Sequence, residues 1–138
     1  MSRSGYSYDC EESSLNLYRA NVDRALAGKR GQAFLREMLA ALDALPNKRL
    51  ISEAMESDGE VCAIASVGRY RGTDMSKLDP ENYEEWDFSV AVGQAFNIAQ
   101  PMAAEIMYIN DDDCVAYGET PEHRYVRVRE WVAQQIHV

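Results

Sequence analysis

The chain has 138 residues, of which 46% are hydrophobic and 27% are charged, and its formal net charge is −9. These values are ordinary for a globular protein, so they argue against extensive disorder and favour one domain spanning residues 1–138. No apolar run approaches the ~20 residues that span a bilayer, and the first 14 residues lack the apolar core of a signal peptide. We therefore expect a cytoplasmic protein without a membrane segment, in which residues 1–12 form a flexible or loosely packed N-terminal segment.

The first third of the chain predicts two helices. Serines before residue 15 are N-cap candidates for the first helix, whose apolar residues recur at steps of three and four until Gly28 ends it. A second apolar stripe runs over residues 34–45, and Pro46 stops it. Because the link "GKRG" between the two stripes is short, we expect the helices to pack as an antiparallel hairpin.

The middle of the chain is less regular. Residues 48–63 could form a minor β-hairpin, whereas the small residues that follow suit close helix packing, so we expect a helix from about Glu60 to Tyr70 that Gly72 ends. A polar, acid-rich connector follows, and Pro80 within it suits the first turn of a short helix.

Three further helices are predicted in the remainder. "SVAVGQAFNIAQPMAAEIMYIND" indicates two short helices with a break before Pro101. The last helix is the best marked, because Thr120 is a natural N-cap and Pro121 suits the first helical position. The fold class is therefore all-α, a compact single-domain helical bundle of five to seven helices with a minor β-hairpin allowed around residues 48–63.

Residues 107–124, "MYINDDDCVAYGETPEHR", carry the densest potential metal ligands. A calcium loop of the EF-hand type needs acids at loop positions 1, 3 and 5 and glycine at position 6, and no register of this stretch provides them. A zinc site needs more than one thiolate beside His123, and only Cys114 is near. We therefore expect an acidic helix connector, with no metal and no cofactor.

Other motifs give little support for catalysis. The three cysteines, Cys10, Cys62 and Cys114, form no CxxC pair and are expected to be free thiols, with Cys62 in the core. "AGKRGQ" lacks the arrangement of a phosphate-binding loop, and no nucleophile elbow or H-E-x-x-H motif occurs. "GRYRG" is too short for a nucleic-acid contact, and the negative net charge opposes direct nucleic-acid binding. We assign no catalytic residue and do not expect an enzyme.

Charge is unevenly distributed along the chain. Residues 74–122 contain twelve acids and a single base, Lys77, so their net charge is −11, whereas the rest of the chain has eleven acids and thirteen bases. A concentrated acidic surface repels nucleic acid and attracts basic grooves of other proteins. The alternative is that these acids simply solvate connectors. On the first interpretation we predict a partner-binding face made of eight acids: Glu81, Glu84, Glu85, Asp87, Asp111, Asp112, Asp113 and Glu119.

Several segments carry a family resemblance: "GKRGQAFLREMLAALDALPNKRLI", "DGEVCAIASVG", "DMSKLDPEN", "AAEIMYIND" and "ETPEHRYVRVREWV". Over residues 28–136 the chain resembles small acidic proteins encoded in phage and prophage genomes of proteobacteria. That family supplies no catalytic residue to carry over. The resemblance implies a phage accessory role in the cytoplasm of a bacterial host, and by analogy an antagonist of host defence such as an anti-CRISPR protein or another DNA mimic.

Two classes of function follow. The first is a non-enzymatic inhibitor that binds a host nucleic-acid-handling defence protein, such as a CRISPR effector complex, through its acidic surface in competition with nucleic acid. The second is a module or enzyme that binds a small ligand, for example a nucleotide, in a pocket between helices. The first should weaken steeply with salt, and the second should gain thermal stability from a small molecule.

Overall fold

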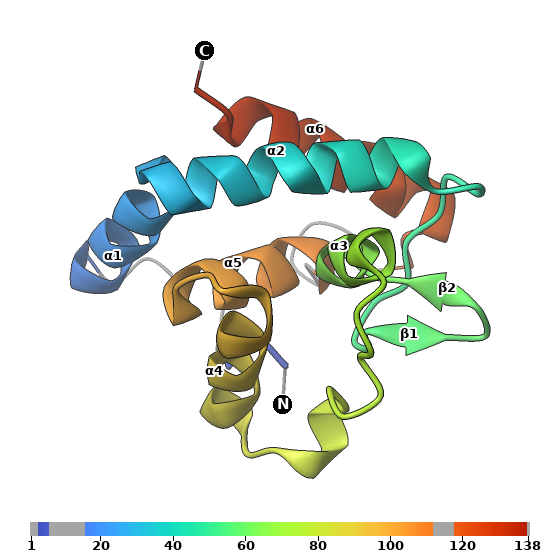
Figure 1. The fold of residues 1–138 in the computed structure, drawn as a ribbon, viewed down its shortest axis with the longest axis horizontal. Helices are drawn as coiled ribbons and strands as arrows, with labels where there is room; N and C mark the ends of the chain where they lie inside the picture. The colour runs from blue at the N-terminus through green and yellow to red at the C-terminus, as the bar shows by residue number, and fades with distance from the viewer. Residues whose placement is uncertain (1–2, 6–15, 112–117, 138) are drawn as a thin grey trace.

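The computed structural model describes residues 3–5, 16–111 and 118–137. In this part of the chain it contains six α-helices and one two-stranded antiparallel sheet (Figure 1), which confirms the predicted all-α class with a minor hairpin. The elements are α1 (Asn16–Ala27), α2 (Lys29–Ala44), β1 (Glu56–Ser57), β2 (Glu60–Val61), α3 (Ala63–Arg71), a 3₁₀ turn (Pro80–Asn82), α4 (Glu85–Phe96), α5 (Gln100–Asp111) and α6 (Pro121–Gln135). None of the helices in these ranges is long and apolar enough to span a bilayer.

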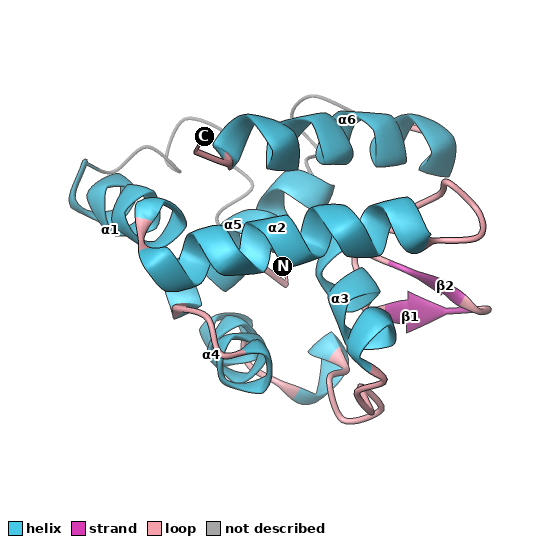
Figure 2. Cartoon of the chain, turned by 45° about the horizontal axis from the view of Figure 1, so that its top comes forward, coloured by secondary structure: helices cyan, strands magenta, loops and turns pink. Residues whose placement is uncertain are grey.

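Helix α2 lies at the centre of the packing. Its predicted apolar stripe is buried against α1, α3 and α6, because Phe34, Leu35, Met38 and Leu42 recur on one face of the helix. α6 runs antiparallel beside α2 in both Figure 1 and Figure 2. At one end of this pair the Tyr125 hydroxyl donates to the Leu42 carbonyl at 2.9 Å. At the other end the side-chain amide of Gln32 donates to the backbone carbonyl of Gln135 at 2.9 Å.

The predicted antiparallel hairpin of the first two helices is wrong. Only Gly28 separates α1 from α2, and its N–H still donates to Arg24 O at 2.9 Å while its carbonyl accepts from Gln32 N–H at 2.8 Å. Helical bonding therefore reaches both sides of Gly28, and no loop is left in which the chain could reverse. A Cβ at Gly31 would lie 1.9 Å from the Ala25 carbonyl oxygen, so the bend between α1 and α2 requires glycine there.

The hairpin around residues 48–63 is present as β1 and β2. Asp58 and Gly59 connect the strands with φ of 53° and 79°, the two positive values that a tight hairpin turn needs. This pairing takes Glu60 and Val61 into a strand, so α3 begins at Ala63 and not at about Glu60 as predicted. The predicted end of α3 is confirmed, since Gly72 caps it with φ of 73°.

The C-terminal helices agree with the sequence pattern. α4 ends at Asn97, whose φ of 57° turns the chain, and Pro101 lies in the first turn of α5. The Thr120 side chain accepts from the His123 backbone N–H at 3.1 Å, which confirms its role as N-cap of α6. Within the apolar stripe of α6, Tyr125 is buried like its neighbours on α2, whereas Trp131 is only partly buried.

The beginning of the chain differs from the expected loose segment. Arg3 and Ser4 are buried, with 5% and 1% of their surfaces exposed. Residues 6–12, the rest of the predicted segment, lie outside the described ranges. Charged side chains are rarely buried without a partner, and the partner of Arg3 is the carboxylate of Asp111.

Two valines on α6 provide a matched test of this packing. Val128 is fully buried and Val126 is 62% exposed, although they lie two residues apart on the same helix. We expect Val128→Ala to lower the free energy of unfolding by roughly 2 kcal/mol or more, because it removes two buried methyl groups and leaves a cavity. Val126→Ala should stay within about 0.5 kcal/mol of the parent. Urea denaturation measures both, and equal losses would contradict the described orientation of α6.

Candidate functional site

The eight acids predicted to share one face separate into two groups. Glu81, Glu84 and Asp87 are exposed. Asp111 and Glu119 have only 10% and 1% of their side chains exposed and form ion pairs within the molecule. The remaining three are not assigned to either group: Asp112 and Asp113 lie outside the described residues, and the structure places Glu85 at the start of α4 without describing its side chain.

Asp111, the last residue of α5, is paired with the buried Arg3. Arg3 Nε donates to Asp111 Oδ2 at 2.7 Å and Arg3 Nη2 donates to Oδ1 at 3.0 Å, the two-point geometry typical of strong arginine–carboxylate pairs. A carboxylate held in this way presents little free charge at the surface. Asp111 therefore contributes little exposed charge to the predicted partner-binding face.

Glu119 stabilises the start of α6. Its carboxylate accepts from Arg127 Nε at 2.8 Å and Nη2 at 2.9 Å, and it also contacts His123 and Arg124. The hydrogen bonds from Arg127, together with those from His123 and the positive charges of Arg127 and Arg124, outweigh the opposing effect of burial and lower the pKa of Glu119. Glu119 is thus a structural carboxylate that contributes little exposed charge to the predicted partner-binding face.

Two further acids of the negative stretch are paired with arginines from the first half of the chain. Arg19 of α1 donates to both carboxylate oxygens of Glu105, at 2.8 and 3.0 Å, and Arg49 donates to Glu122 of α6. Charges that are far apart in the sequence therefore lie side by side in the fold. The acids of residues 74–122 do not act as one group, because folding brings bases to several of them.

Within the negative stretch, most of the acids that the structure describes as exposed lie in residues 74–87, which we call the acidic segment. It contains six acids and one base, Lys77, a net charge of −5: the acids are Asp74, Asp79, Glu81, Glu84, Glu85 and Asp87. Asp74 and Asp79 each accept from a backbone N–H two residues later, at 2.9 and 3.0 Å. The bond from Ser76 lowers the pKa of Asp74. Among the described residues, no basic side chain forms an ion pair with Glu81, Glu84 or Asp87.

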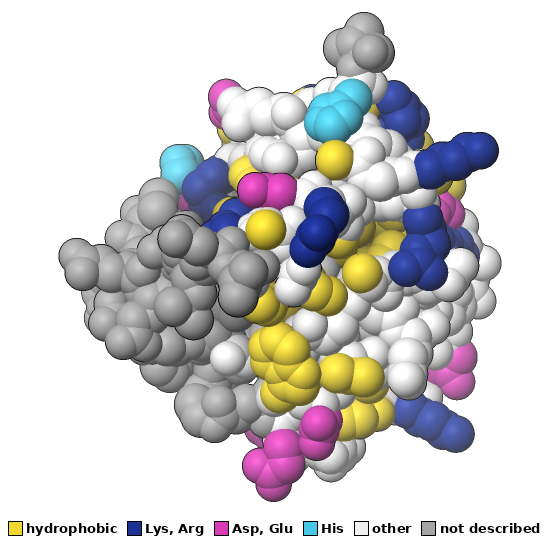
Figure 3. Space-filling model, turned by 90° about the vertical axis from the view of Figure 1, so that its left-hand side faces the viewer, with side chains coloured by type: hydrophobic (Ala, Val, Ile, Leu, Met, Phe, Trp, Pro, Cys, Tyr) yellow, Lys and Arg dark blue, Asp and Glu magenta, His cyan; other side chains and the backbone are white. Residues whose placement is uncertain are grey.

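An exposed aromatic side chain accompanies these acids. Trp86 is 46% exposed, and its ring meets that of Tyr18 edge to face with 6.1 Å between the centroids. Tyr83 packs against the buried Phe88 at 5.5 Å and so anchors the acidic segment to α4. On the side of the molecule that carries α1 and α4, hydrophobic side chains gather above an acidic edge, while most basic side chains lie higher on the same side (Figure 3).

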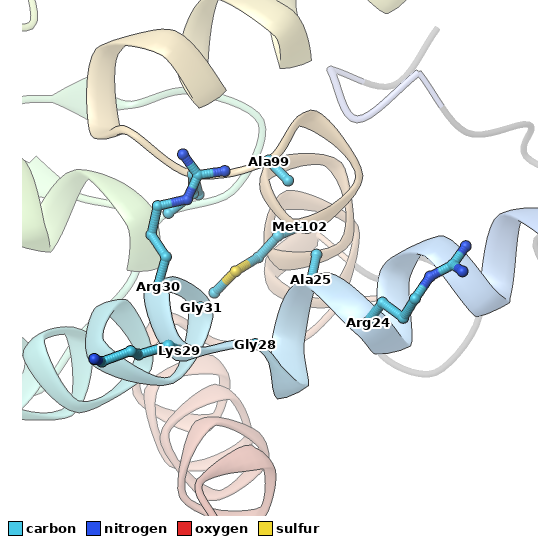
Figure 4. Close-up of a pocket in the computed structure, with 9 residues that line it drawn as sticks. Arg24, Ala25, Gly28, Lys29, Arg30, Gly31, Ala99 and Met102 are labelled. Carbon is cyan, nitrogen blue, oxygen red and sulfur yellow. The ribbon is translucent and has the colours of Figure 1, made fainter.

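A separate cavity of about 210 Å³ lies where the bend between α1 and α2 meets the start of α5 (Figure 4). Ala25, Ile98 and Met102 provide apolar walls, and three bases lie at its rim: Arg24, Lys29 and Arg30. Arg30 extends toward Ala99 and donates to the Asn97 side chain at 3.3 Å, whereas Arg24 and Lys29 point away on either side. This cavity is smaller than the roughly 300–1,000 Å³ of typical ligand pockets.

Metal-binding geometry is not found in the described ranges. No group of three or more His, Cys, Asp or Glu side chains there could hold an ion. Cys114, considered above as a zinc ligand, lies outside those ranges, as does Cys10. Cys62 is a free thiol buried in the core, as predicted.

Comparison of the chain with protein-family models, with curated proteins and with solved structures finds no match. The resemblance to phage and prophage proteins therefore stays a prediction from the sequence segments alone.

The structural role of Glu119 can be tested by Glu119→Gln. We expect a loss of roughly 1–3 kcal/mol in the free energy of unfolding at neutral pH, because hydrogen bonds to a charged group are replaced by weaker ones. Glu130→Gln on the exposed side of α6 is the matched control and should be nearly neutral.

The same pair of variants predicts a pH dependence. Because the pKa of Glu119 is lowered from 4.5 in the folded protein, its contribution to stability is complete above about pH 4.5 and is lost as the pH falls through the folded pKa. The gap between wild type and Glu119→Gln should therefore close below about pH 4.5. A gap that persists unchanged into strong acid would show that the carboxylate charge is not what stabilises α6.

Proposed function

We propose that this protein is a non-enzymatic phage or prophage accessory protein that binds and inhibits a host nucleic-acid-handling defence protein, with a CRISPR effector complex as the leading candidate. The acidic segment is the contact surface in this proposal, and it competes with nucleic acid for a basic groove of the partner. The supporting observation is that Glu81, Glu84 and Asp87 are exposed and form no ion pair within the described structure. Four other acids of the negative stretch are instead paired with arginines: Glu105, Asp111, Glu119 and Glu122.

Unpaired acids are suited to this role for a physical reason. An acid that is already paired within the molecule gains little from a partner's base, because its internal ion pair must first be broken. Exposed acids instead attract a basic surface over a distance of about one Debye length and increase the rate of association. The acidic segment retains both its charge and its exposure, and it therefore resembles a row of phosphates in its electrostatic effect.

Trp86 supplies the apolar part of the proposed contact. Interfaces derive much of their affinity from a few buried aromatic residues surrounded by polar ones, and tryptophan is the residue most enriched at such positions. Trp86 lies between Glu84 and Asp87 in the sequence and is about half exposed. In this proposal the exposed acids of the acidic segment increase the rate of association with the partner, and burial of Trp86 at the interface contributes to the affinity of the complex.

The test is a charge reversal confined to the acidic segment. Glu81→Lys, Glu84→Lys and Asp87→Lys are combined in one variant, and inhibition of phage-targeting immunity is measured in a bacterial strain that expresses it. We expect inhibition to be lost while the melting curve stays close to wild type, because exposed charges contribute less than about 1 kcal/mol each to stability. Loss of several complementary charges in an interface should cost at least about tenfold in affinity.

The control variant changes the same amount of charge elsewhere. Asp23→Lys, Glu56→Lys and Glu130→Lys alter three exposed acids outside the acidic segment and raise the net charge equally. This variant should inhibit like wild type. Equal loss in both variants would indicate a general effect of net charge, and retained inhibition in the folded Glu81/Glu84/Asp87 variant would refute the proposed surface.

A second candidate function is binding of a small anion or nucleotide in the cavity at the bend between α1 and α2. The observation that favours it is the three bases at the cavity rim. Phosphate or a nucleotide at saturation should then raise the melting temperature, and Arg30→Ala should abolish the rise. The small volume and the outward direction of two of the bases make this the weaker candidate.

A further inference from the structure

The surroundings of Arg3 form a closed set of contacts for a guanidinium group. Besides the two bonds to Asp111, Nη1 donates to the Ala54 carbonyl at 3.1 Å and contacts Cys62 Sγ at 3.3 Å and Met55 Sδ at 3.6 Å. Only 1% of the Arg3 side chain is exposed. Burial by itself would lower the pKa of Arg3, but the attraction of Cys62 and Asp111 outweighs it and raises the pKa, so the guanidinium stays charged.

The walls of this site are held by contacts in which Arg3 takes no part. Asp111 Oδ1 accepts from the Glu53 backbone N–H at 3.0 Å and from the Asn110 side-chain amide at 2.9 Å. Asn110 is itself fixed, because its carbonyl oxygen accepts from Ala63 N–H at 3.0 Å and its amide donates to Ile51 O at 2.9 Å. The carboxylate is therefore oriented by Glu53, in the segment before β1, and by Asn110, through contacts that do not involve Arg3.

The backbone is strained at this site. Glu53 has φ of 64°, in the left-handed region that residues other than glycine rarely adopt. This conformation directs the Glu53 N–H at Asp111. Strained backbone tends to occur at ligand-binding and active sites, where the binding groups must be held in one geometry.

The shape of the site selects a planar cation. Two acceptors on Asp111 match the two parallel N–H groups of a guanidinium, and the carbonyl and two sulfur atoms surround its third nitrogen. An ammonium group is a compact point charge and cannot use these acceptors together. The site therefore distinguishes arginine from lysine by geometry and not by charge.

We propose that this pocket is a guanidinium-binding site in its own right, in which Arg3 is a tethered ligand that the arginine side chain of another peptide can replace. A tether of this kind holds its ligand at an effective concentration of the order of millimolar, so weak free ligands do not compete while Arg3 is present. Removing the Arg3 side chain exposes the site to arginine compounds supplied in solution. This inference is independent of the acidic segment and of its proposed partner.

The experiment is chemical rescue of Arg3→Ala. The variant should melt well below wild type, because Asp111 loses its buried partner. Methylguanidinium at tens of millimolar should then raise the melting temperature of Arg3→Ala saturably, by roughly 4 °C or more. Wild type should not respond, and denaturation by guanidinium compounds needs concentrations on the order of 1 M, far above this range.

Three comparisons identify the site and the ligand. Sodium chloride at the same ionic strength controls for screening, and methylammonium controls for positive charge without the planar fork. The variant Arg3→Ala/Asp111→Asn should not respond to methylguanidinium. A peptide Ser-Arg-Ser-Gly should rescue Arg3→Ala, whereas Ser-Lys-Ser-Gly should not, which tests whether an arginine carried by a second chain can occupy the pocket.

Each outcome decides the proposal. Rescue by methylguanidinium and by the arginine peptide, abolished by Asp111→Asn, supports it. Equal effects of methylammonium, equal rescue of the double variant, or a stability of Arg3→Ala that matches wild type would each overturn it. If Arg3→Ala is unfolded without ligand, recovery of helical circular dichroism on adding methylguanidinium replaces the melting curve, and no recovery overturns the proposal.

Discussion

Asn110 and Asp111, at the C-terminal end of α5, bond to segments from the whole length of the chain. Their side chains bind Arg3, the backbone of Ile51 and Glu53, and the first N–H of α3. Arg127 of α6 donates to the carbonyls of Ile109 and Asn110 at 2.6 and 3.2 Å, where the helix would otherwise leave acceptors unsatisfied. One helix end thus connects the N-terminal residues, the β-hairpin, α3 and α6.

This arrangement explains why the distribution of acids along the sequence differs from the distribution of unpaired acids in the folded molecule. Arg3, Arg19 and Arg49 each pair with a carboxylate of the negative stretch and thereby connect elements that are distant in the sequence. The structural use of Asp111 and Glu119 removes their charge from the exposed acidic surface. The acidic segment keeps its charge because the arginines of the described structure pair elsewhere, for example Arg71 with Glu37 and Arg129 with Asp43. Exposure alone therefore does not identify an unpaired acid, since Glu122 and Asp43 are about half exposed and yet paired with arginines.

The features that could be predicted from the sequence are those that depend on a local pattern of residues. Helix positions follow from apolar periodicity, and the ends of α3 and α6 follow from Gly72 and Thr120, because caps act over a few residues. The relation between α1 and α2 was not predictable in this way, since it depends on the contact of Gly31 with the Ala25 carbonyl in three dimensions. The burial of Arg3 was likewise inaccessible, because its partner Asp111 lies 108 residues away.

For the candidate site, composition located the acids but not their partners. The one available signal was the arginine-rich start of α6: Arg127 lies eight residues after Glu119, within reach of the chain that precedes the helix. Charge counting treats such a pair as two independent charges. Counting charges along the sequence therefore predicted that Asp111 and Glu119 contribute to an exposed acidic surface, although their side chains are mostly buried. The same count could not distinguish them from the exposed acids Glu81, Glu84 and Asp87.

The central claim is that the end of α5 holds these distant segments together, and amide hydrogen exchange of Asn110→Ala compared with wild type tests it most directly. Protection should be lost together at the start of α3 and at residues 51–53, because the Asn110 side chain bonds to Ala63 and Ile51 and orients Asp111, which accepts from the Glu53 N–H. Protection of α6 should change less, because Arg127 donates to backbone carbonyls that alanine keeps. Gln100→Ala, which removes a bond to Ser89 at the other end of α5, should change exchange only near α4. Loss of protection confined to Ala63 in the Asn110→Ala variant would contradict the claim.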